Sequence, residues 1–266
     1  MELAVICGQV VDLVTQTAVF IRNEAGRVLP SQIETKQRNH LVSYVDKKSE
    51  QLLIEGLRRL LPEAGFVAEE GSVEQQLDRA WQWVIDPLDG TTNFLHQLPV
   101  YAISVGLLHE GEPVLGVVYE VNNAECFWAW KGGGAYLNGQ KISVTASVDF
   151  QLALFGTGFP YYDFSAFEQY ISVLRQLMQH TKGVRRFGAA AVDLCYVACG
   201  RFDGFFEHSL SIWDVAGGAV IVTEAGGRIA DFKGGRNFLW GREIVVAAPC
   251  VWEQFFAIVH AHLGAI

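Results

Sequence analysis

An apolar segment that ends in two carboxylates and a glycine–hydroxyl turn constrains this chain more than any other feature. The segment occupies residues 83–93 (WVIDPLDGTTN). The ring of Pro87 fixes φ and stiffens the turn, and Gly90 permits backbone geometry that brings amides close to an anion. Carboxylates bind hard divalent cations such as Mg²⁺, whereas glycine amides and hydroxyls suit a phosphate. The segment therefore predicts a site for both ligands, although a solvated surface turn uses the same residue types.

Two other segments also place acids at the edge of a core element. Glu69 follows a short apolar strand in residues 66–71 (FVAEEG), and Asp214 stands at the head of a predicted helix in residues 211–219 (SIWDVAGGA). Taken separately, Glu69 also fits a solvated strand end and Asp214 a helix N-cap. Carboxylates about 4 Å apart repel by about 4 kcal/mol per pair at an effective dielectric constant of about 20. A cluster of all these acids therefore needs cations or protons.

These segments carry a family resemblance. Residues 86–93 (DPLDGTTN) and 213–218 (WDVAGG), with residues 224–227 (EAGG) downstream, resemble the two signatures of the inositol monophosphatase family. Residues 23–46, 131–139 (KGGGAYLNG) and 193–204 (DLCYVACGRFDG) also resemble the family, so the match runs nearly end to end. Two positions depart from its pattern: Ala68 stands where glycine is common, and Ala189 where serine or threonine is usual.

The resemblance implies an α/β (α+β) fold, a layered αβαβα sandwich of the inositol monophosphatase and fructose-1,6-bisphosphatase type, in a single domain over residues 1–266. The residue pattern predicts strands at 65–68, 81–85, 102–108, 113–121 and 125–129, and a hairpin turn at 132–134. It predicts helices up to about residue 23 and at 47–61, 163–179, 191–198, 215–225 and 251–262. Residues 38–40 are expected in a polar connection.

The resemblance also implies a cluster of two or three Mg²⁺ ions. Glu69, Asp86 and the backbone carbonyl of Leu88 would hold one ion, and Asp86, Asp89 and Asp214 a second, so that Asp86 bridges the two. Phosphate monoesters hydrolyse very slowly without catalysis. An enzyme has to neutralise the dianion, position a water molecule and stabilise the leaving alkoxide.

The remaining site residues are likewise assigned by resemblance. Thr91 would help to deprotonate the attacking water together with Asp46, and Glu69 would orient a water near a third ion, with no phosphoenzyme. Without the resemblance, Asp46 fits the N-cap of the second helix equally well. Substrate contacts are assigned to Asp89, Gly90, Thr91, Ala190 and Glu207, with the amides of Gly90 and Thr91 on the phosphate.

The choice of substrate is less constrained. Relatives of this fold hydrolyse inositol monophosphates, fructose 1,6-bisphosphate, histidinol phosphate or nucleotide 3′-phosphates with the same metal carboxylates. Residues 94–99 (FLHQLP) most resemble the inositol monophosphatase branch, and Glu207 lies where that branch contacts a hydroxyl of the substrate. We therefore expect inositol-1-phosphate.

Other classes of protein fit the residues less well. Haloacid-dehalogenase-type phosphatases use two aspartates two positions apart, whereas Asp86 and Asp89 are three apart. This chain lacks the G-x-S-x-G motif of one large class of serine hydrolases. A binding or regulatory protein that retains the phosphatase fold stays an alternative, against which the complete set of metal carboxylates argues.

Composition and charge bound the partners and the location. The formal net charge of −9 disfavours a nucleic-acid surface, although Arg185 and Arg186 form a local basic pair that also fits a solvated strand end. The N-terminus lacks the positive charge of a secretory signal, and we expect no membrane span. Five cysteines without paired metal spacing indicate reduced thiols, so we expect a cytoplasmic protein. The family resemblance implies a homodimer.

Overall fold

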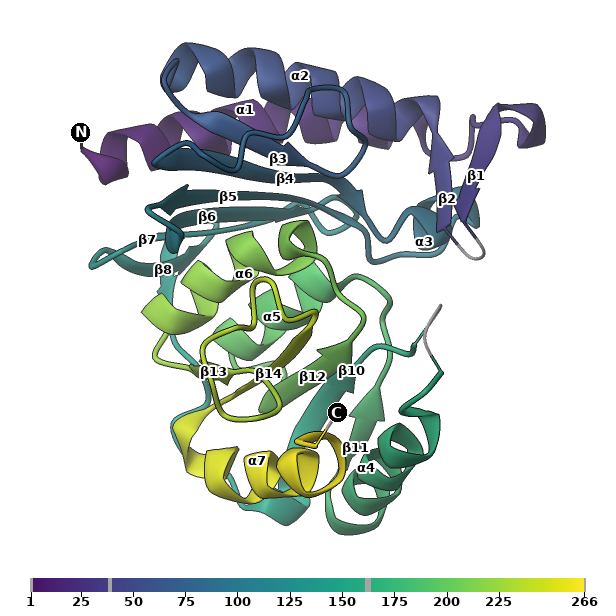
Figure 1. Cartoon of the computed structure of the whole chain (residues 1–266), viewed down its shortest axis with the longest axis vertical. Coiled ribbons are helices and arrows are strands. Elements are labelled where there is room, and N and C mark those ends of the chain that lie inside the picture. Colours follow the sequence, from purple (N-terminus) through teal and green to yellow (C-terminus); the bar gives the residue numbers. More distant parts are fainter. Residues whose placement is uncertain (1, 38–39, 161–163, 266) are drawn as a thin grey trace.

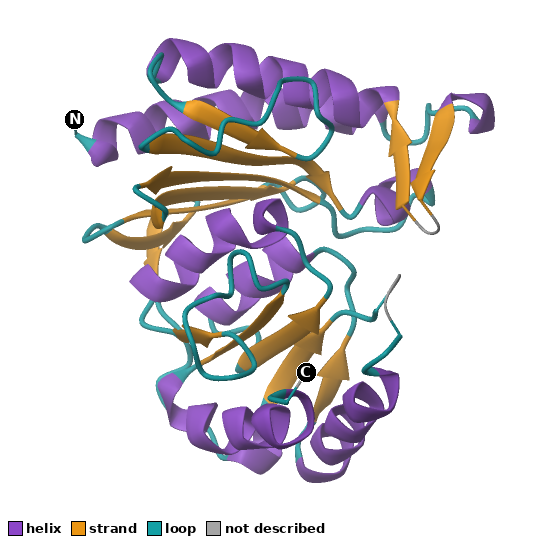
Figure 2. Ribbon diagram, viewed as in Figure 1, coloured by secondary structure: helices purple, strands orange, loops and turns teal. Residues whose placement is uncertain are grey.

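Five alternating layers of helices and sheets make up the molecule. The computed structural model describes residues 2–37, 40–160 and 164–265. From top to bottom in Figures 1 and 2, a helix pair, a large sheet, a second helix pair, a smaller sheet and a third helix pair follow one another. The predicted αβαβα sandwich is confirmed.

The large sheet has seven strands in sequence order, β3 to β9. Only β3 and β4 pair in parallel, and every later pair is antiparallel. The strands are β3 (Gly65–Ala68), β4 (Trp81–Asp89), β5 (Ala102–His109), β6 (Glu112–Glu120), β7 (Glu125–Trp130), β8 (Gly134–Leu137) and β9 (Gln140–Ile142). All five strands predicted in this region are present, and the three-glycine segment forms the turn between β7 and β8, as expected.

Helices α1 (Leu3–Glu24) and α2 (Tyr44–Leu60) cover the outer face of the large sheet. By length and composition alone, α1 is apolar enough to cross a membrane. Its apolar stripe, however, packs into the core against α2 and the sheet. The buried residues recur every three or four positions: Ile6, Cys7, Val10, Val14, Thr17, Ala18 and Ile21.

The segment between α1 and α2 differs from the predicted polar connection. Strand β1 (Ile33–Gln37) pairs antiparallel with β2 (His40–Ser43), and residues 38 and 39 lie outside the described residues. The second helix begins at Tyr44 rather than at residue 47, because Ser43 caps it by accepting a hydrogen bond from the Val45 amide at 3.1 Å. This short ribbon carries Leu41 toward the cavity described below.

Helices α5 (Ala190–Ala198) and α6 (Ile212–Glu224) fill the space between the two sheets. Both are apolar on nearly every side, as expected for helices buried between two layers. Helix α6 approaches the large sheet so closely that a Cβ atom on Gly116 would lie 2.1 Å from the carbonyl oxygen of Gly217. Glycine at both positions therefore sets the spacing between α6 and the sheet.

The smaller sheet has the strand order β11-β10-β12-β14-β13 and mixes parallel and antiparallel pairs. Its strands are β10 (Leu154–Thr157), β11 (Gly183–Arg185), β12 (Gly204–His208), β13 (Arg228–Ala230) and β14 (Glu243–Ala247). Helices α4 (Phe167–His180) and α7 (Pro249–Leu263) cover its outer face. Helix α4 begins later than predicted, and the expected start at Asp163 lies outside the described residues.

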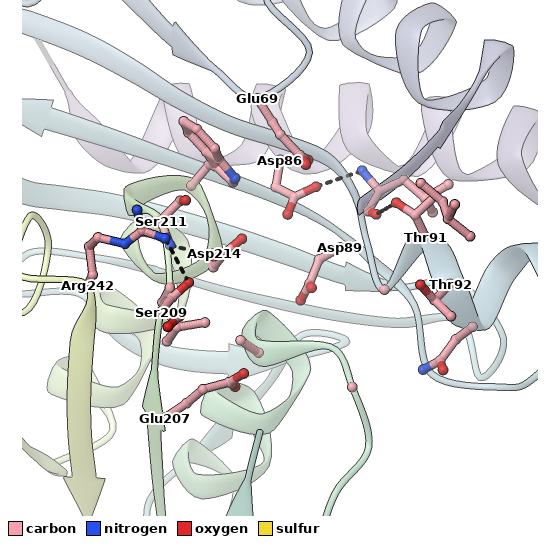
Figure 3. Close-up of a pocket in the computed structure, with 18 of the residues that line it drawn as sticks. Glu69, Asp86, Asp89, Thr91, Thr92, Glu207, Ser209, Ser211, Asp214 and Arg242 are labelled. Atoms are coloured by element: carbon pink, nitrogen blue, oxygen red, sulfur yellow. Dashed lines mark hydrogen bonds between the residues drawn. The ribbon is translucent and has the colours of Figure 1, made fainter. Parts of the chain in front are cut away.

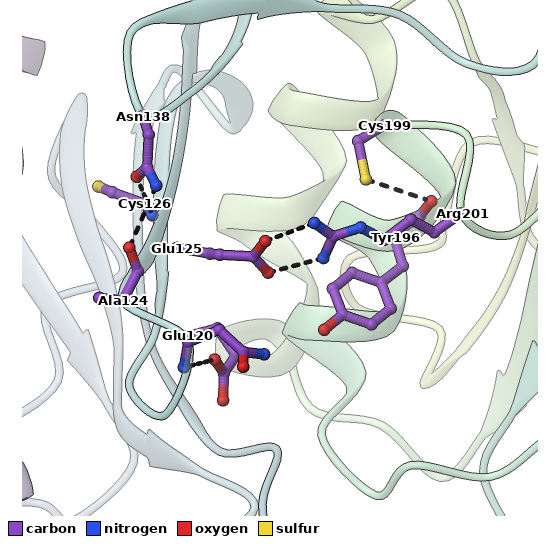
Figure 4. Close-up of polar contacts among 9 residues, drawn as sticks. Glu120, Ala124, Glu125, Cys126, Asn138, Tyr196, Cys199 and Arg201 are labelled. Atoms are coloured by element: carbon purple, nitrogen blue, oxygen red, sulfur yellow. Dashed lines mark hydrogen bonds and ion pairs between the residues drawn. The ribbon is translucent and has the colours of Figure 1, made fainter.

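An ion pair connects the large sheet to the segment that follows α5 (Figure 4). The guanidinium of Arg201, which follows α5, donates two hydrogen bonds to the carboxylate of Glu125 in β7, one of them at 2.6 Å. The same guanidinium lies over the ring of Tyr196, 4.7 Å from its centroid. Because the Glu125 side chain is largely covered, this bidentate pair is better defined than an ordinary surface ion pair.

Candidate functional site

A β-bulge in β4 brings Asp86 and Asp89 to one side of the large sheet. Side chains three residues apart in a regular strand point to opposite faces. In β4, Asp86 pairs with Ser104 but Asp89 pairs with Ala102, so the strand contains one extra residue between the two acids. The bulge includes Pro87, which cannot donate a ladder hydrogen bond. The extra residue restores the alternation, and both carboxylates face the same cavity.

This cavity, of about 500 Å³, contains most of the predicted site residues (Figure 3). It lies where the carboxyl end of β4 meets the N-terminal ends of α5 and α6 and the end of β12. The predicted residues in its walls are Glu69, Asp86, Leu88, Asp89, Gly90, Thr91, Ala190, Glu207 and Asp214. Asp46 lies behind the wall and contacts Thr91.

Two of the acids occupy the same position in their helices. Asp46 and Asp214 are each the third residue of a helix whose N-cap is a serine, Ser43 for α2 and Ser211 for α6. The Ser43 amide donates to Asp46 Oδ2 at 2.9 Å, and the Ser211 amide donates to Asp214 Oδ2 at 2.6 Å. The N-cap alternative for both aspartates is therefore wrong. Each carboxylate is fixed by one oxygen in a capping box.

Asp89 is held by a third helix. The N-cap of α5 is Ala189, whose side chain cannot cap, and the amide of Ala191 donates instead to Asp89 Oδ2 at 2.7 Å. The Ala190 amide also hydrogen-bonds to this carboxylate. Asp89 thus caps α5 from another strand, at the position where Ala189 departs from the family pattern. The positive end of the helix dipole favours the ionised carboxylate.

Gly90 has the left-handed conformation that the turn needs, with φ of 88°. A Cβ atom there would lie 3.0 Å from the carbonyl oxygen of Val100 and 3.3 Å from Ala189 Cβ. Any side chain would therefore be strained in its backbone and crowded by the wall.

The Thr91 hydroxyl lies between two oxygen acceptors. Thr91 Oγ1 is 2.9 Å from Asp46 Oδ1 and 2.9 Å from the carbonyl oxygen of Leu88. The hydroxyl has one hydrogen, so the two acceptors compete for it. Burial raises the pKa of Asp46, and the hydrogen bonds from Ser43 and Thr91 oppose this shift. The arrangement can pass a proton between Thr91 and Asp46.

The acids perturb one another. Burial, and then the charges of Glu69, Asp89 and Asp214, raise the pKa of Asp86 well above its usual range. Burial and the charge of Asp214 do the same to the pKa of Asp89, against the helix amides that lower it. A cluster of carboxylates that repel one another in this way is stabilised by protons or by cations.

The donor set fits hard divalent cations, which prefer oxygen ligands and would take the place of such protons. Within the described part of the chain, no three His, Cys, Asp or Glu side chains converge on one point as a preformed metal site. The four acids instead stand in the walls of one cavity, where their carboxylates are the groups that could hold such a cation.

Comparison with known proteins assigns the family. The model of the inositol monophosphatase family matches residues 2–263. The chain belongs to the inositol monophosphatase family. Its relatives carry two kinds of name. A protein of Neisseria meningitidis serogroup B (strain MC58) named "Putative Nus factor SuhB" is 43% identical over 239 residues, 90% of this chain and 92% of that protein.

A protein of Rhizobium meliloti (strain 1021) named "Inositol-1-monophosphatase" is 40% identical over 235 residues, 88% of each chain. Among solved structures, the extragenic suppressor protein suhB of Bartonella henselae superposes with a TM-score of 0.89 at 34% identity. The superposition covers 96% of this chain and 98% of that one. The relatives thus support the family and the fold, while their names divide between an enzyme and a Nus factor.

Glu207, which the family resemblance assigns to the substrate, lies on β12 at the far side of the cavity from Thr91 (Figure 3). Burial raises its pKa to about 8, although the nearby Arg186 opposes the shift. A Cβ atom on Gly158 would lie 1.7 Å from Glu207 Oε1, so the glycine leaves room for this carboxyl group.

Several residues of the cavity were not predicted from the sequence. Arg186 was noted only as part of a basic pair, but it is half-buried and lines the cavity. Four of the others lie inside the motif segments but were given no role: Thr92, Asn93, Ser211 and Trp213. The rest carry no local motif that would have identified them: Leu41, Gly188, His208, Ser209, Leu210 and Arg242. These come from segments that only the folded inositol monophosphatase sandwich brings together.

Proposed function

We propose that this chain is a Mg²⁺-dependent phosphate monoester hydrolase whose preferred substrate is inositol-1-phosphate. The observation that carries the proposal is the meeting of four acids, one just after β3, two in β4 and one in α6, with the Gly90–Thr91 turn in one cavity. Acids alone would suit a cation, and the turn alone would suit a phosphate. Their combination suits a metal-bound phosphate ester.

In this proposal Glu69, Asp86 and the carbonyl of Leu88 would hold one ion, and Asp86, Asp89 and Asp214 would hold another. The bound ions would neutralise the phosphate dianion, lower the pKa of a coordinated water and stabilise the leaving alkoxide. A third, weaker ion would lie near Glu69.

The protein's own groups position the reactants and move the protons. The amides of Gly90 and Thr91 hold phosphate oxygens, and the Thr91 hydroxyl accepts a proton from the attacking water and relays it toward Asp46 Oδ1, 2.9 Å away. Ala190 at the start of α5 bounds the phosphate, and Glu207 orients the hydroxyls of the leaving alcohol. The attack is direct, without a covalent phosphoenzyme.

Purified protein with Mg²⁺, assayed for phosphate release over a panel of phosphate monoesters, tests this proposal. We expect inositol-1-phosphate to give the highest kcat/KM, with fructose 1,6-bisphosphate, histidinol phosphate and nucleotide 3′-phosphates below it. Release that is equal with and without Mg²⁺, or absent from all esters, would contradict the proposal.

We propose a Nus-factor role as a second candidate, because the relative at 43% identity carries that name. A strain lacking the gene and complemented with Asp89→Asn separates the two candidates, because this variant removes a proposed metal ligand. Full complementation by the inactive variant would favour the Nus-factor role, and failure to complement would favour the hydrolase.

The remaining expectations stay predictions. Five free cysteines, two of them at least partly exposed, accord with a reducing cytoplasmic location. The single-domain organisation and the homodimer are proposed from the family.

A further inference from the structure

Arg242 stands at the rim of the cavity in an unusual backbone conformation. It lies just before β14, is exposed and has φ of 64°, and Ser209, opposite it after β12, has φ of 71°. The Leu210 amide donates to the Arg242 carbonyl at 3.1 Å, and Arg242 Nη2 donates to the Ser209 carbonyl at 3.3 Å. Non-glycine residues rarely adopt positive φ, and such strain concentrates at functional sites.

The position of Arg242 relative to the turn defines what it can contact. In Figure 3, Arg242 lies beside Ser209, Ser211 and Asp214, across the acids from Thr91 and Thr92. If the phosphoryl group lies on the Gly90–Thr91 turn, the alcohol part of the ester extends toward Glu207 and Ser209. Arg242 then lies at the outer end of the alcohol. This step rests on the proposed function.

The charges of the cavity make this arginine distinctive. Five acids line the walls, and the lysine and arginine residues among the lining residues are Arg186 and Arg242 alone. Arg186 lies over the ring of Phe159 at 5.6 Å and acts on the buried Glu207. Arg242 is exposed, and one of its five N–H donors is used within the described structure. Away from the proposed metal ions and the Gly90–Thr91 turn, a second anion in this cavity would meet acids everywhere except beside an arginine.

We propose that Arg242 lets this site also accept phosphate esters whose alcohol carries a second anionic group, in addition to the inositol-1-phosphate proposed above. The planar guanidinium presents paired donors to a carboxylate or a second phosphate, which a lysine would not reproduce. The phosphoryl group binds at the metal side, and the second anion binds at the rim. Inositol-1-phosphate, which has no second anion, is held on that side by hydroxyl contacts only.

Non-hydrolysable phosphonates test this assignment on the full chain with Mg²⁺, independently of turnover. Propylphosphonate and 3-phosphonopropionate differ only in a terminal methyl or carboxylate, and ethane-1,2-bisphosphonate replaces the carboxylate with a second phosphonate. Isothermal titration calorimetry gives the ratio of the Kd of propylphosphonate to that of each ligand with two anionic groups. The variants are Arg242→Gln, Arg242→Lys and, as a control, Arg236→Gln. Arg236 lies on the same connection and pairs with Glu112 away from the cavity.

We expect the wild-type chain to favour the ligands with two anionic groups and Arg242→Gln to lower the ratio about five- to tenfold. The ratio of Arg242→Lys should lie between those of Arg242→Gln and the wild-type chain, and the ratio of Arg236→Gln should equal that of the wild-type chain. The larger of the two ratios shows whether a carboxylate or a second phosphonate is the preferred second anion. An unchanged ratio in Arg242→Gln, an equal fall in Arg236→Gln, or no binding of either phosphonate to the wild-type chain overturns the assignment. The ester panel reports separately on hydrolysis, so failure of one proposal is distinguishable from failure of the other.

Discussion

The hydroxyl of Thr91 donates toward a carboxylate that is 45 positions away in the chain, Asp46 Oδ1, at 2.9 Å. The contact joins the turn after β4 to the first turn of α2. Asp46 Oδ2 is already occupied by the amide and hydroxyl of Ser43, so Oδ1 is the oxygen available to Thr91. A capping box therefore aims a buried acid at the residue proposed to take the proton from water.

The first prediction compares Asp86→Asn with Asp46→Asn. Asp86→Asn removes the proposed bridge between two ions and should abolish measurable Mg²⁺-dependent phosphate release. Asp46→Asn removes support for proton transfer, which typically contributes about 10²- to 10⁴-fold, and should leave measurable activity. Steady-state kinetics on inositol-1-phosphate measures both. Asp12→Asn, an exposed change on α1, is the matched control. Equal losses in the two site variants would contradict the assigned roles.

Metal dependence is the second prediction. Exhaustive chelation should abolish phosphate release and added Mg²⁺ should restore it, because the acids of the cavity otherwise repel the phosphate dianion. By family resemblance, Li⁺ should inhibit the Mg²⁺-loaded enzyme. Full turnover by the chelated protein would contradict the metal site.

The third prediction links pH to the effect of Mg²⁺ on stability. Burial and neighbouring acids raise the pKa values of Asp86 and Asp89 above those of the unfolded chain. The protonated acids favour the metal-free fold below the unfolded pKa, and this contribution is lost as pH rises through the raised pKa values. Mg²⁺ binds the ionised acids, so its stabilising effect grows over the same range.

Differential scanning calorimetry from about pH 5.5 to about pH 8 should therefore show a rise in Tm on adding Mg²⁺ that increases with pH. In Asp86→Asn this dependence should be weaker. A Tm increment that is independent of pH in the wild-type chain would mean that these carboxyls do not titrate as a cluster.

Glu207→Gln is the fourth test. Above about pH 8, where Glu207 is mostly ionised, the variant should lower kcat/KM on inositol-1-phosphate by the equivalent of about 1–3 kcal/mol, because a hydrogen bond from the substrate hydroxyl to a charged group is lost. Its effect on an aryl phosphate, which lacks those hydroxyls, should be smaller. Kinetics on both esters decides: equal losses would assign Glu207 to the metal machinery, and no loss on either would remove it from the site.

The fifth prediction concerns Gly90→Ala, with Gly226→Ala as a matched control. The two glycines have nearly equal φ, 88° and 89°, but a Cβ atom on Gly226 would meet nothing within 4 Å. Both variants should be destabilised by on the order of 1 kcal/mol, because alanine is strained at positive φ. Gly90→Ala adds the steric clash with the carbonyl oxygen of Val100. Urea unfolding should therefore show a larger loss of stability for Gly90→Ala. Equal losses would show that the wall around Gly90 yields freely.

Most of the helices and strands, and the candidate metal and phosphate residues, could be predicted from the sequence alone. Alternating and continuous apolar runs predicted the strands that carry Glu69 and Asp86, because burial of a strand leaves a local pattern. The combined motifs also identified the family. Helix boundaries were less accurate: α2 begins three residues early because Ser43 caps it, and the short strands β1 and β2 have no apolar pattern of their own.

The side of the sheet to which each carboxylate points depends on the tertiary structure. The bulge between Asp86 and Asp89 places the Asp89 side chain on the same side of the sheet as that of Asp86. An extra residue in a strand depends on the pairing with β5 rather than on residue type. Likewise, the Asp46–Thr91 contact, the capping of α5 by Asp89 and the place of Arg242 each join segments distant in sequence. Such contacts arise when packed layers close a cavity, and no local pattern of residues records which segments will meet.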